Sequence, residues 1–157
     1  MAYETAKFIH IIGIIMLLGN VTATAIWKFF ADRSQDARIV AFGQRLVTLT
    51  DWSLTVWGAA LTMIGGYGAA IIAQMDLVGE RWLFWGQILF IATGVLWLGI
   101  LVPLQIRLAR LAKGFQAGGD IPDAYWRASR WWFIVGLAIT VPLVAAAWVM
   151  VVKPNGF

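Results

Sequence analysis

Cysteine is absent from this 157-residue chain, and charged residues make up only 13% of it. Without cysteine the chain has no disulfide, no cysteine-bound iron–sulfur cluster and no thiol catalysis of its own. A soluble domain carries about a quarter charged residues, so a charged fraction this low, beside 61% hydrophobic residues, argues against a soluble fold. Histidine occurs only once, at His10. A metal site built from several histidines is therefore excluded as well.

The few charges are also unevenly distributed. No Asp, Glu, Lys or Arg occurs in 8–27, 52–75, 82–106 or 131–152, and each of these runs has 20 to 25 residues. A helix needs roughly 20 apolar residues to cross about 30 Å of hydrocarbon. The sequence therefore predicts an all-α polytopic membrane protein, a four-transmembrane-helix bundle, in one transmembrane domain over 1–157. The expected spans are approximately 6–29, 51–75, 82–106 and 130–152.

The basic residues predict the orientation of these spans. Nine Lys and Arg residues lie in 28–51 and 107–130, and three, Lys7, Arg81 and Lys153, lie on the other side. The positive-inside rule places the two richer segments in the cytoplasm, with the N-terminus and C-terminus outside. The first run is too long for the apolar region of a signal peptide and has no small-residue cleavage site, so we expect it to be retained. The net charge of +4 then reflects topology, and no nucleic-acid partner is expected.

The two cytoplasmic segments differ in character. In 36–50, apolar residues alternate with Arg38, Gln44 and Arg45, which predicts an amphipathic helix that lies on the membrane or extends the second span. The segment between the third and fourth spans contains Gly114, the pair Gly118-Gly119 and a proline, and is predicted to be a flexible connection.

Small and polar residues recur at steps of three and four along the spans, which predicts the faces that pack inward. The first span offers Tyr3, Ala6, His10, Gly13, Leu17, Asn20, Thr24 and Trp27, and the second offers Asp51, Thr55, Gly58, Thr62 and Gly65. The third offers Gln87, Gly94 and Gln105, with a kink expected at Pro103, and the fourth offers Gly136, Thr140, Ala147 and Met150. Packing seams explain most of these residues. We expect a polar interior made of Asn20, Thr24, Asp51, Thr55, Gln87 and Arg107.

His10 is the strongest candidate for chemistry. It lies one helical turn inside Lys7, near the outer surface, and an ionisable group within a span marks a functional site by default. Zinc and copper sites need several ligands, whereas haem needs only one axial ligand from the protein. Two interpretations stay open: an axial ligand to haem b, or a histidine that only bonds a neighbouring helix. The expected cofactor-binding residues are His10, Lys7, Met150 and Lys153, with Arg81 and Met75 as alternatives.

A second group of charges marks the cytoplasmic end. Asp51 opens the second span, Lys28 closes the first and Arg107 closes the third, so we expect Asp51 to pair with Arg107 or Lys28. A proton or ion path is the alternative. No carboxylate lies inside a charge-free run, which weakens a transporter hypothesis. The sequence predicts no catalytic residue, because no nucleophile with a partner base and no phosphate-binding loop occurs.

Several short motifs carry a family resemblance. They are KFIHI at 7–11, LGNV at 18–21, TAIW at 24–27, ADRS at 31–34, LTDW at 49–52, VPLQ at 102–105 and MVVKP at 150–154. Together they resemble a bacterial family of predicted integral membrane proteins of unknown function. That family is distantly similar to HemJ-type protoporphyrinogen oxidases and to the membrane domain of CopD-like copper-resistance proteins. The resemblance implies a haem ligand at His10 and a matching terminal lysine at Lys153, although a second histidine is missing.

Three functional hypotheses result. The leading one is a haem- or porphyrin-binding membrane protein that is redox-active through His10. The second is a non-enzymatic accessory or structural subunit of a larger membrane complex, and the third is a transporter of a small molecule or ion. The expected partners are the lipid bilayer and either further copies of the chain or other subunits. The resemblance implies a multi-pass protein of the bacterial inner (plasma) membrane.

Overall fold

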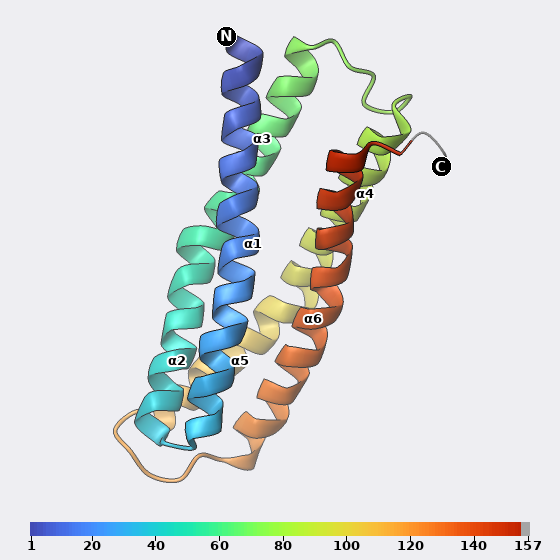
Figure 1. Cartoon of the computed structure of the whole chain (residues 1–157). Helices are drawn as coiled ribbons and strands as arrows, with labels where there is room; N and C mark the ends of the chain where they lie inside the picture. The colour runs from blue at the N-terminus through green and yellow to red at the C-terminus, as the bar shows by residue number, and fades with distance from the viewer. Residues whose placement is uncertain (155–157) are drawn as a thin grey trace. The chain divides into compact units, whose positions relative to one another are not determined.

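The computed structural model describes residues 1–154, and within them every regular element is a helix (Figure 1). Four of the helices in this part of the chain are long and apolar enough to cross a membrane: Ala2–Ser34, Ala37–Ile72, Arg81–Phe115 and Asp123–Val152. The predicted all-α fold with four membrane-spanning helices is confirmed. Each helix extends beyond its charge-free run at one end at least, because the flanking sequence there is amphipathic and not helix-breaking.

The second and third long helices each contain a π-helical turn. The second consists of α2 (Ala37–Thr50), η1 (Asp51–Thr55) and α3 (Val56–Ile72), and the third of α4 (Arg81–Leu96), η2 (Trp97–Leu101) and α5 (Val102–Phe115). The amphipathic segment 36–50 therefore extends the second span, which was one of its two interpretations. Pro103 is the second residue of α5, just after η2. A proline has no N–H to donate, and a wider turn accommodates its ring. The turn at Asp51 has no proline to explain it.

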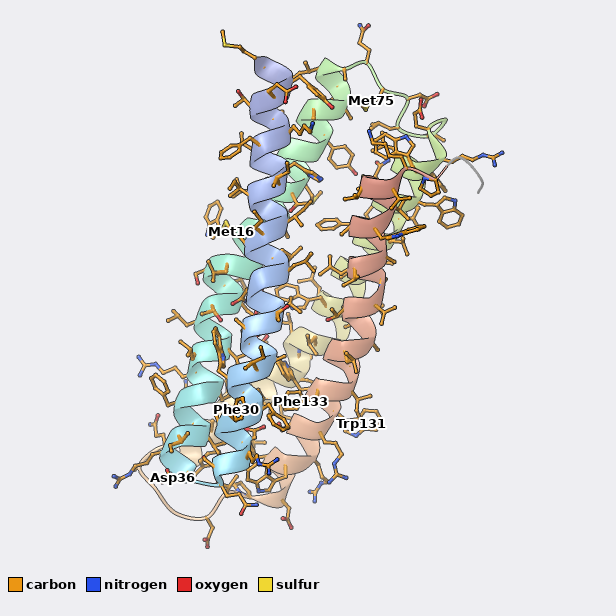
Figure 2. All side chains as sticks on the ribbon, in the orientation of Figure 1. Met16, Phe30, Asp36, Met75, Trp131 and Phe133 are labelled. Atoms are coloured by element: carbon orange, nitrogen blue, oxygen red, sulfur yellow. The ribbon has the colours of Figure 1, made fainter. Side chains whose placement is uncertain are left out.

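A short connection joins α1 (Ala2–Ser34) to α2. Gln35 ends α1 in the left-handed conformation, with φ of 55°. Asp36 then caps α2, since its side chain accepts hydrogen bonds from the backbone N–H groups of Arg38 and Ile39 (Figure 2). A carboxylate cap satisfies donors that a helix start leaves open. This connection makes α1 and α2 antiparallel neighbours.

The connection between α3 and α4 is held by hydrogen bonds from its own backbone N–H groups to the side chain of Asp76. Asp76 Oδ1 accepts hydrogen bonds from the N–H groups of Gly79 at 2.9 Å and Val78 at 3.0 Å. These two donors hold the pKa of the exposed Asp76 carboxyl below its ordinary value, and the bond from Gly79 has the larger effect. The turn is thus ordered by local bonds.

The chain forms two compact units. Unit 1 comprises Met1–Gln74 and Leu108–Trp126, and unit 2 comprises Met75–Arg107 and the chain from Arg127 onward. The largest fully buried side chains all belong to unit 1: Tyr125, Lys28, Leu108, Gln44, Val40 and Val47. Unit 1 therefore contains a tightly packed core beside its basic helix ends.

The predicted flexible connection between the third and fourth spans is shorter than expected. The third helix continues to Phe115, and α6 (Asp123–Val152) begins seven residues before Arg130. Only 116–122 connects them, and it includes Gly118 and Gly119 with φ of 109° and 112°. The Lys and Arg residues around it are good helix formers, which is why the helices extend into this region.

In unit 1, α1 and α3 approach each other so closely that only glycine fits at the crossing. A Cβ built on Gly58 would come within 2.9 Å of the Leu17 backbone N, and one on Gly13 would come within 2.7 Å of the Gly58 carbonyl O. A Cβ on Gly65 would collide with the His10 backbone N. Lipid provides no hydrophobic drive for helices to associate, so close backbone approach at small residues drives this pairing.

Unit 2 has its own small-residue contact, between α4 and α6. A Cβ on Gly86 would collide with the Met150 methyl group, Cε. At the same end, the Lys153 ammonium lies 4.5 Å from the centroid of the Trp82 ring. The Gln87 side chain donates to the carbonyl O of Leu77 at 2.9 Å. Met150 and Lys153 therefore have structural partners within unit 2.

The inward faces that the sequence predicts agree best with the structure in the first two spans. Asp51, Thr55, Gly58, Thr62 and Gly65 are all buried, as are five residues of the first stripe: Ala6, Gly13, Leu17, Asn20 and Thr24. In α6 the buried face is Trp132, Ile139, Leu143, Ala146 and Val149. The predicted stripe in the fourth span, with Gly136 and Thr140, is only half-buried. Small residues marked the buried face poorly there, because most of the residues that form it within the span are bulky and apolar.

The close crossing predicts different effects for two glycines of α1. Gly13→Ala should lower the free energy of unfolding by about 1–3 kcal/mol, because the added methyl group overpacks the contact with the Gly58 carbonyl. Gly19→Ala is the matched control, since a Cβ there would meet none of the described atoms within 4 Å. Unfolding in detergent, followed by circular dichroism, measures both. Equal stability of the two variants would contradict the crossing.

Candidate functional site

His10 lies on the face of α1 that packs against α3. Its side chain is half-buried, and Nδ1 lies 2.7 Å from the backbone carbonyl O of Thr62. Because a carbonyl oxygen only accepts, the proton of this bond belongs to Nδ1. A neutral imidazole carries one ring proton, so Nε2 then keeps its lone pair. This geometry assigns the tautomer in which Nε2 can bind a ligand.

Two glycines of α3 make room for the imidazole. A Cβ on Gly66 would lie 2.8 Å from Nδ1 and 3.1 Å from Cε1 of His10, and Gly65 allows the backbones to approach. The segment 65–68 is closely packed where Gly65 and Gly66 face α1. The two glycines thus leave space for the backbone and for the ring of His10.

A second polar group joins the middle of α1 to the π-helical turn η1. Asn20 Nδ2 donates to Asp51 Oδ1 at 2.8 Å and to Thr55 Oγ1 at 2.9 Å. The Thr55 hydroxyl in turn donates to Asp51 Oδ1 at 2.9 Å. All three side chains are more than nine-tenths buried. They form a closed triangle of hydrogen bonds, which we call the Asp51 triangle.

The third polar group lies further along α1. The Lys28 ammonium forms an ion pair with Asp32 at 3.0 Å and donates to the Tyr125 hydroxyl at 2.9 Å. That hydroxyl lies 3.2 Å from Asp32 Oδ1. The Lys28 side chain is fully buried, whereas that of Asp32 is 12% exposed. The carboxylate therefore links a buried ammonium with the surface.

Part of this arrangement could be predicted from the sequence. It placed Asn20, Thr24, Asp51 and Thr55 in a polar interior, and all four are buried. The hydrogen bonds of Asn20 to Asp51 and Thr55 were not foreseen, because sequence spacing does not show which turns of two helices face each other. Thr24 bonds only within its own helix, to the carbonyl O of Asn20 at 2.8 Å.

The Lys28–Asp32–Tyr125 group was missed, although a signal for it existed. Lys28 and Asp32 are four residues apart, the spacing at which helical side chains meet. Lys28 was instead expected to pair with Asp51. Arg107, which was expected in the polar interior, is exposed in the structure. Whether Asp51 pairs with Arg107 stays a prediction, since the two residues belong to different units.

The remaining predicted cofactor residues occupy separate places. Lys7 is exposed, with its ammonium 5.9 Å from the centroid of the Tyr3 ring in unit 1. Met150 and Lys153 belong to unit 2, and Gln87 there is half-buried. Among residues 1–154, no three His, Asp or Glu side chains gather into a group that could hold a metal ion. The described chain thus offers an imidazole and not a multidentate metal site.

Comparison with known proteins identifies a family and gives no activity. The model of the family described as predicted integral membrane protein (DUF2269) matches residues 4–154. No curated protein and no solved structure matches the chain. The comparisons therefore support the family resemblance and give no support to similarity with HemJ-type or CopD-like proteins.

The buried ion pair predicts a strong effect of one carboxylate. Asp32→Asn should lower the free energy of unfolding by about 3 kcal/mol, because it leaves the fully buried Lys28 ammonium without the charge it pairs with. Glu4→Gln, at an exposed position of the same helix, should change it by less than about 0.5 kcal/mol. Chemical unfolding in mixed micelles compares the two. Similar small effects would show that the pair contributes little.

Proposed function

This chain belongs to the DUF2269 family of predicted integral membrane proteins, and we propose that it binds a haem or porphyrin, with His10 as the axial ligand to iron. The observation that carries the proposal is the hydrogen bond from Nδ1 of His10 to the Thr62 carbonyl. Histidine ligands in metalloproteins usually donate the other ring N–H to a carbonyl or carboxylate, which fixes the tautomer and orients the ring. His10 has that arrangement.

The ligand set also favours haem over a bare metal ion. Haem brings four nitrogen ligands of its own and asks the protein for one axial group. The described residues provide one imidazole and lack any group of three metal-binding side chains. Bound haem would supply one-electron redox chemistry, while the protein holds and orients the axial imidazole. The Lys7 amine, which belongs to the same unit as His10, is the proposed partner of a propionate.

The position of His10 along α1 fits a haem near the outer side of the membrane. It lies two residues inside the charge-free run that begins at Phe8, so it is close to the membrane surface. Propionates could there reach water and the basic residues that flank the spans. We propose the bacterial inner membrane as the location, with the N-terminus outside, from the distribution of Lys and Arg.

A second candidate function is that of an accessory subunit in a larger membrane complex. It is favoured by exposed apolar residues on α2, which lies outside the charge-free runs. Ile39, Phe42 and Leu49 are 49%, 66% and 62% exposed on that helix. Such a surface can face lipid or a partner helix. A colourless protein that purifies with fixed partners in mild detergent would support this second function over the first.

Haem binding predicts a coloured protein whose colour depends on His10. Wild-type protein purified from haem-replete cells should show a Soret band, and His10→Ala should lose it. Gly66→Ala should also weaken it, because the added Cβ would lie 2.8 Å from Nδ1 and displace the ring. Thr22→Ala, at an exposed position on the same helix, is the control that should leave the band unchanged.

Added imidazole provides a further check on the ligand assignment. In His10→Ala, free imidazole should restore the band, because it can occupy the space of the lost ring. A wild-type protein without a Soret band would contradict the proposal. So would a His10→Ala variant with the wild-type spectrum.

A further inference from the structure

The Asp51 triangle lies deeper in the membrane than the sequence suggests. In the sequence, Asp51 stands at the edge of the second charge-free run. In the structure it bonds Asn20, which lies seven residues before Trp27, the last residue of the first charge-free run. Seven residues of α-helix rise about 10 Å, which is about a third of the hydrocarbon thickness. Asp51 is thus a carboxyl inside the span.

The local backbone supports a special role for this position. Asp51 begins the π-helical turn η1, and the N–H of Val56 bonds the carbonyl O of Asp51, five residues earlier. Such turns inside α-helices occur frequently at functional sites. A carboxyl group within a span is costly and usually belongs to an ion or proton pathway. Neither feature is needed to pack α1 against α3, which the glycines already achieve.

Further polar atoms lack a hydrogen-bond partner, from the Asp51 triangle toward the basic end of unit 1, where the Lys28–Asp32–Tyr125 group lies. Asn20 Oδ1, Trp27 Nε1 and both amide atoms of Gln44 are buried and have no hydrogen-bond partner among the described residues. Gln44 is only 1% exposed. Buried polar atoms are nearly always bonded, either to protein or to ordered water. Each of these four atoms, which lie on two packed helices, is able to bond a water molecule.

The placement of these atoms follows from the pairing of α1 with α2. A Cβ on Gly43 would lie 2.6 Å from the Ala31 Cβ, which sets Gln44 near the level of Lys28 on α1. Asp51 is two helical turns further along from Gln44, and Asn20 is about two turns from Lys28. The unpartnered atoms therefore begin at Asn20, within the Asp51 triangle, and continue toward the Lys28–Asp32–Tyr125 group.

We propose that Asp51 is a proton-binding carboxyl within the membrane, and that water held by Gln44, Trp27 and Asn20 connects it with the basic end of unit 1. In the binding step a hydronium ion gives a proton to a carboxylate oxygen of Asp51; an O–H bond forms there and a water molecule remains. The partly exposed Asp32 carboxylate is the entrance of the route. The proposal is independent of haem binding at His10.

Few charged groups on the packed elements of unit 1 compete for this proton. On α1 these are Lys28, Asp32 and Arg33 toward the basic end, and Glu4, Lys7 and His10 toward the other end. On α2 they are Arg38 and Arg45, which are exposed. α3 has no charged residue and contributes only the titratable Tyr67 phenol. The parts of α5 and α6 in unit 1 add Arg110, Lys113 and Asp123, which are exposed. Lys28 is the nearest of these on α1, and it is bonded to Asp32 and Tyr125. Asp51 therefore differs from the other carboxyl groups of unit 1 in its depth along the span.

Infrared difference spectroscopy tests the site directly. The full chain is reconstituted into phosphatidylcholine vesicles, and spectra are compared as the pH is lowered. The wild type should gain the C=O band of a protonated carboxyl that is absent from Asp51→Asn. Asp76→Asn, an exposed carboxyl outside the spans, is the matched control and should keep that band. A band of unchanged size in Asp51→Asn overturns the proposal.

Two further variants test the environment and the route. Thr55→Val keeps the shape of the side chain and removes the hydroxyl that donates to Asp51 Oδ1, so the band should change frequency. An unmoved band overturns the assignment to Asp51. Gln44→Leu should slow the appearance of the band after a rapid pH jump about tenfold, because it removes two hydrogen-bonding atoms from the route. An unchanged rate overturns the route through Gln44.

Discussion

The close crossing of α1 and α3 determines where His10 and the Asp51 triangle lie. Apolar side chains contact lipid as favourably as they contact another helix. The association of helices therefore requires close backbone contact and hydrogen bonds. Gly13, Gly58 and Gly65 provide the contact, because any side chain at these positions would meet backbone atoms of the opposite helix. Once the two helices are fixed at this distance, their polar side chains face each other. Both candidate sites therefore depend on the close packing that these glycines allow.

Two groups at different depths result from this one packing arrangement. His10 meets the Thr62 carbonyl near one end of the span, and Asn20 meets Asp51 and Thr55 ten residues further on, about 15 Å along α1. The first group leaves a ring nitrogen available to a ligand. The second holds a carboxyl inside the span, beside buried polar atoms that need partners. A ligand site and a proton site in one helix pair would suit a redox reaction that consumes or releases protons.

Much of the fold could be predicted from the sequence, because long charge-free runs have few alternatives to membrane helices. The inward faces of the first two spans followed from the spacing of small and polar residues. The helix ends were harder: α2 and α5 continue into amphipathic sequence, where charge is a poor guide to where a helix stops. The depth of Asp51 could not be read from the sequence, since it is inferred from the bond to Asn20. The bond between Lys28 and Tyr125 joins residues 97 apart in the chain, a separation at which local patterns carry no information.

A single measurement tests the central claim that the α1–α3 crossing orients His10 as a ligand. The chain has only one histidine, so ¹⁵N NMR of the cofactor-free protein, labelled at histidine, shows the two nitrogens of one ring. The structure predicts that, at a pH where the ring is neutral, Nδ1 carries the proton and Nε2 shows the shift of an unprotonated nitrogen. Gly66→Ala should disturb both signals. A proton on Nε2 in the wild type would contradict the account, because that ring could neither donate to Thr62 through Nδ1 nor offer Nε2 to a metal.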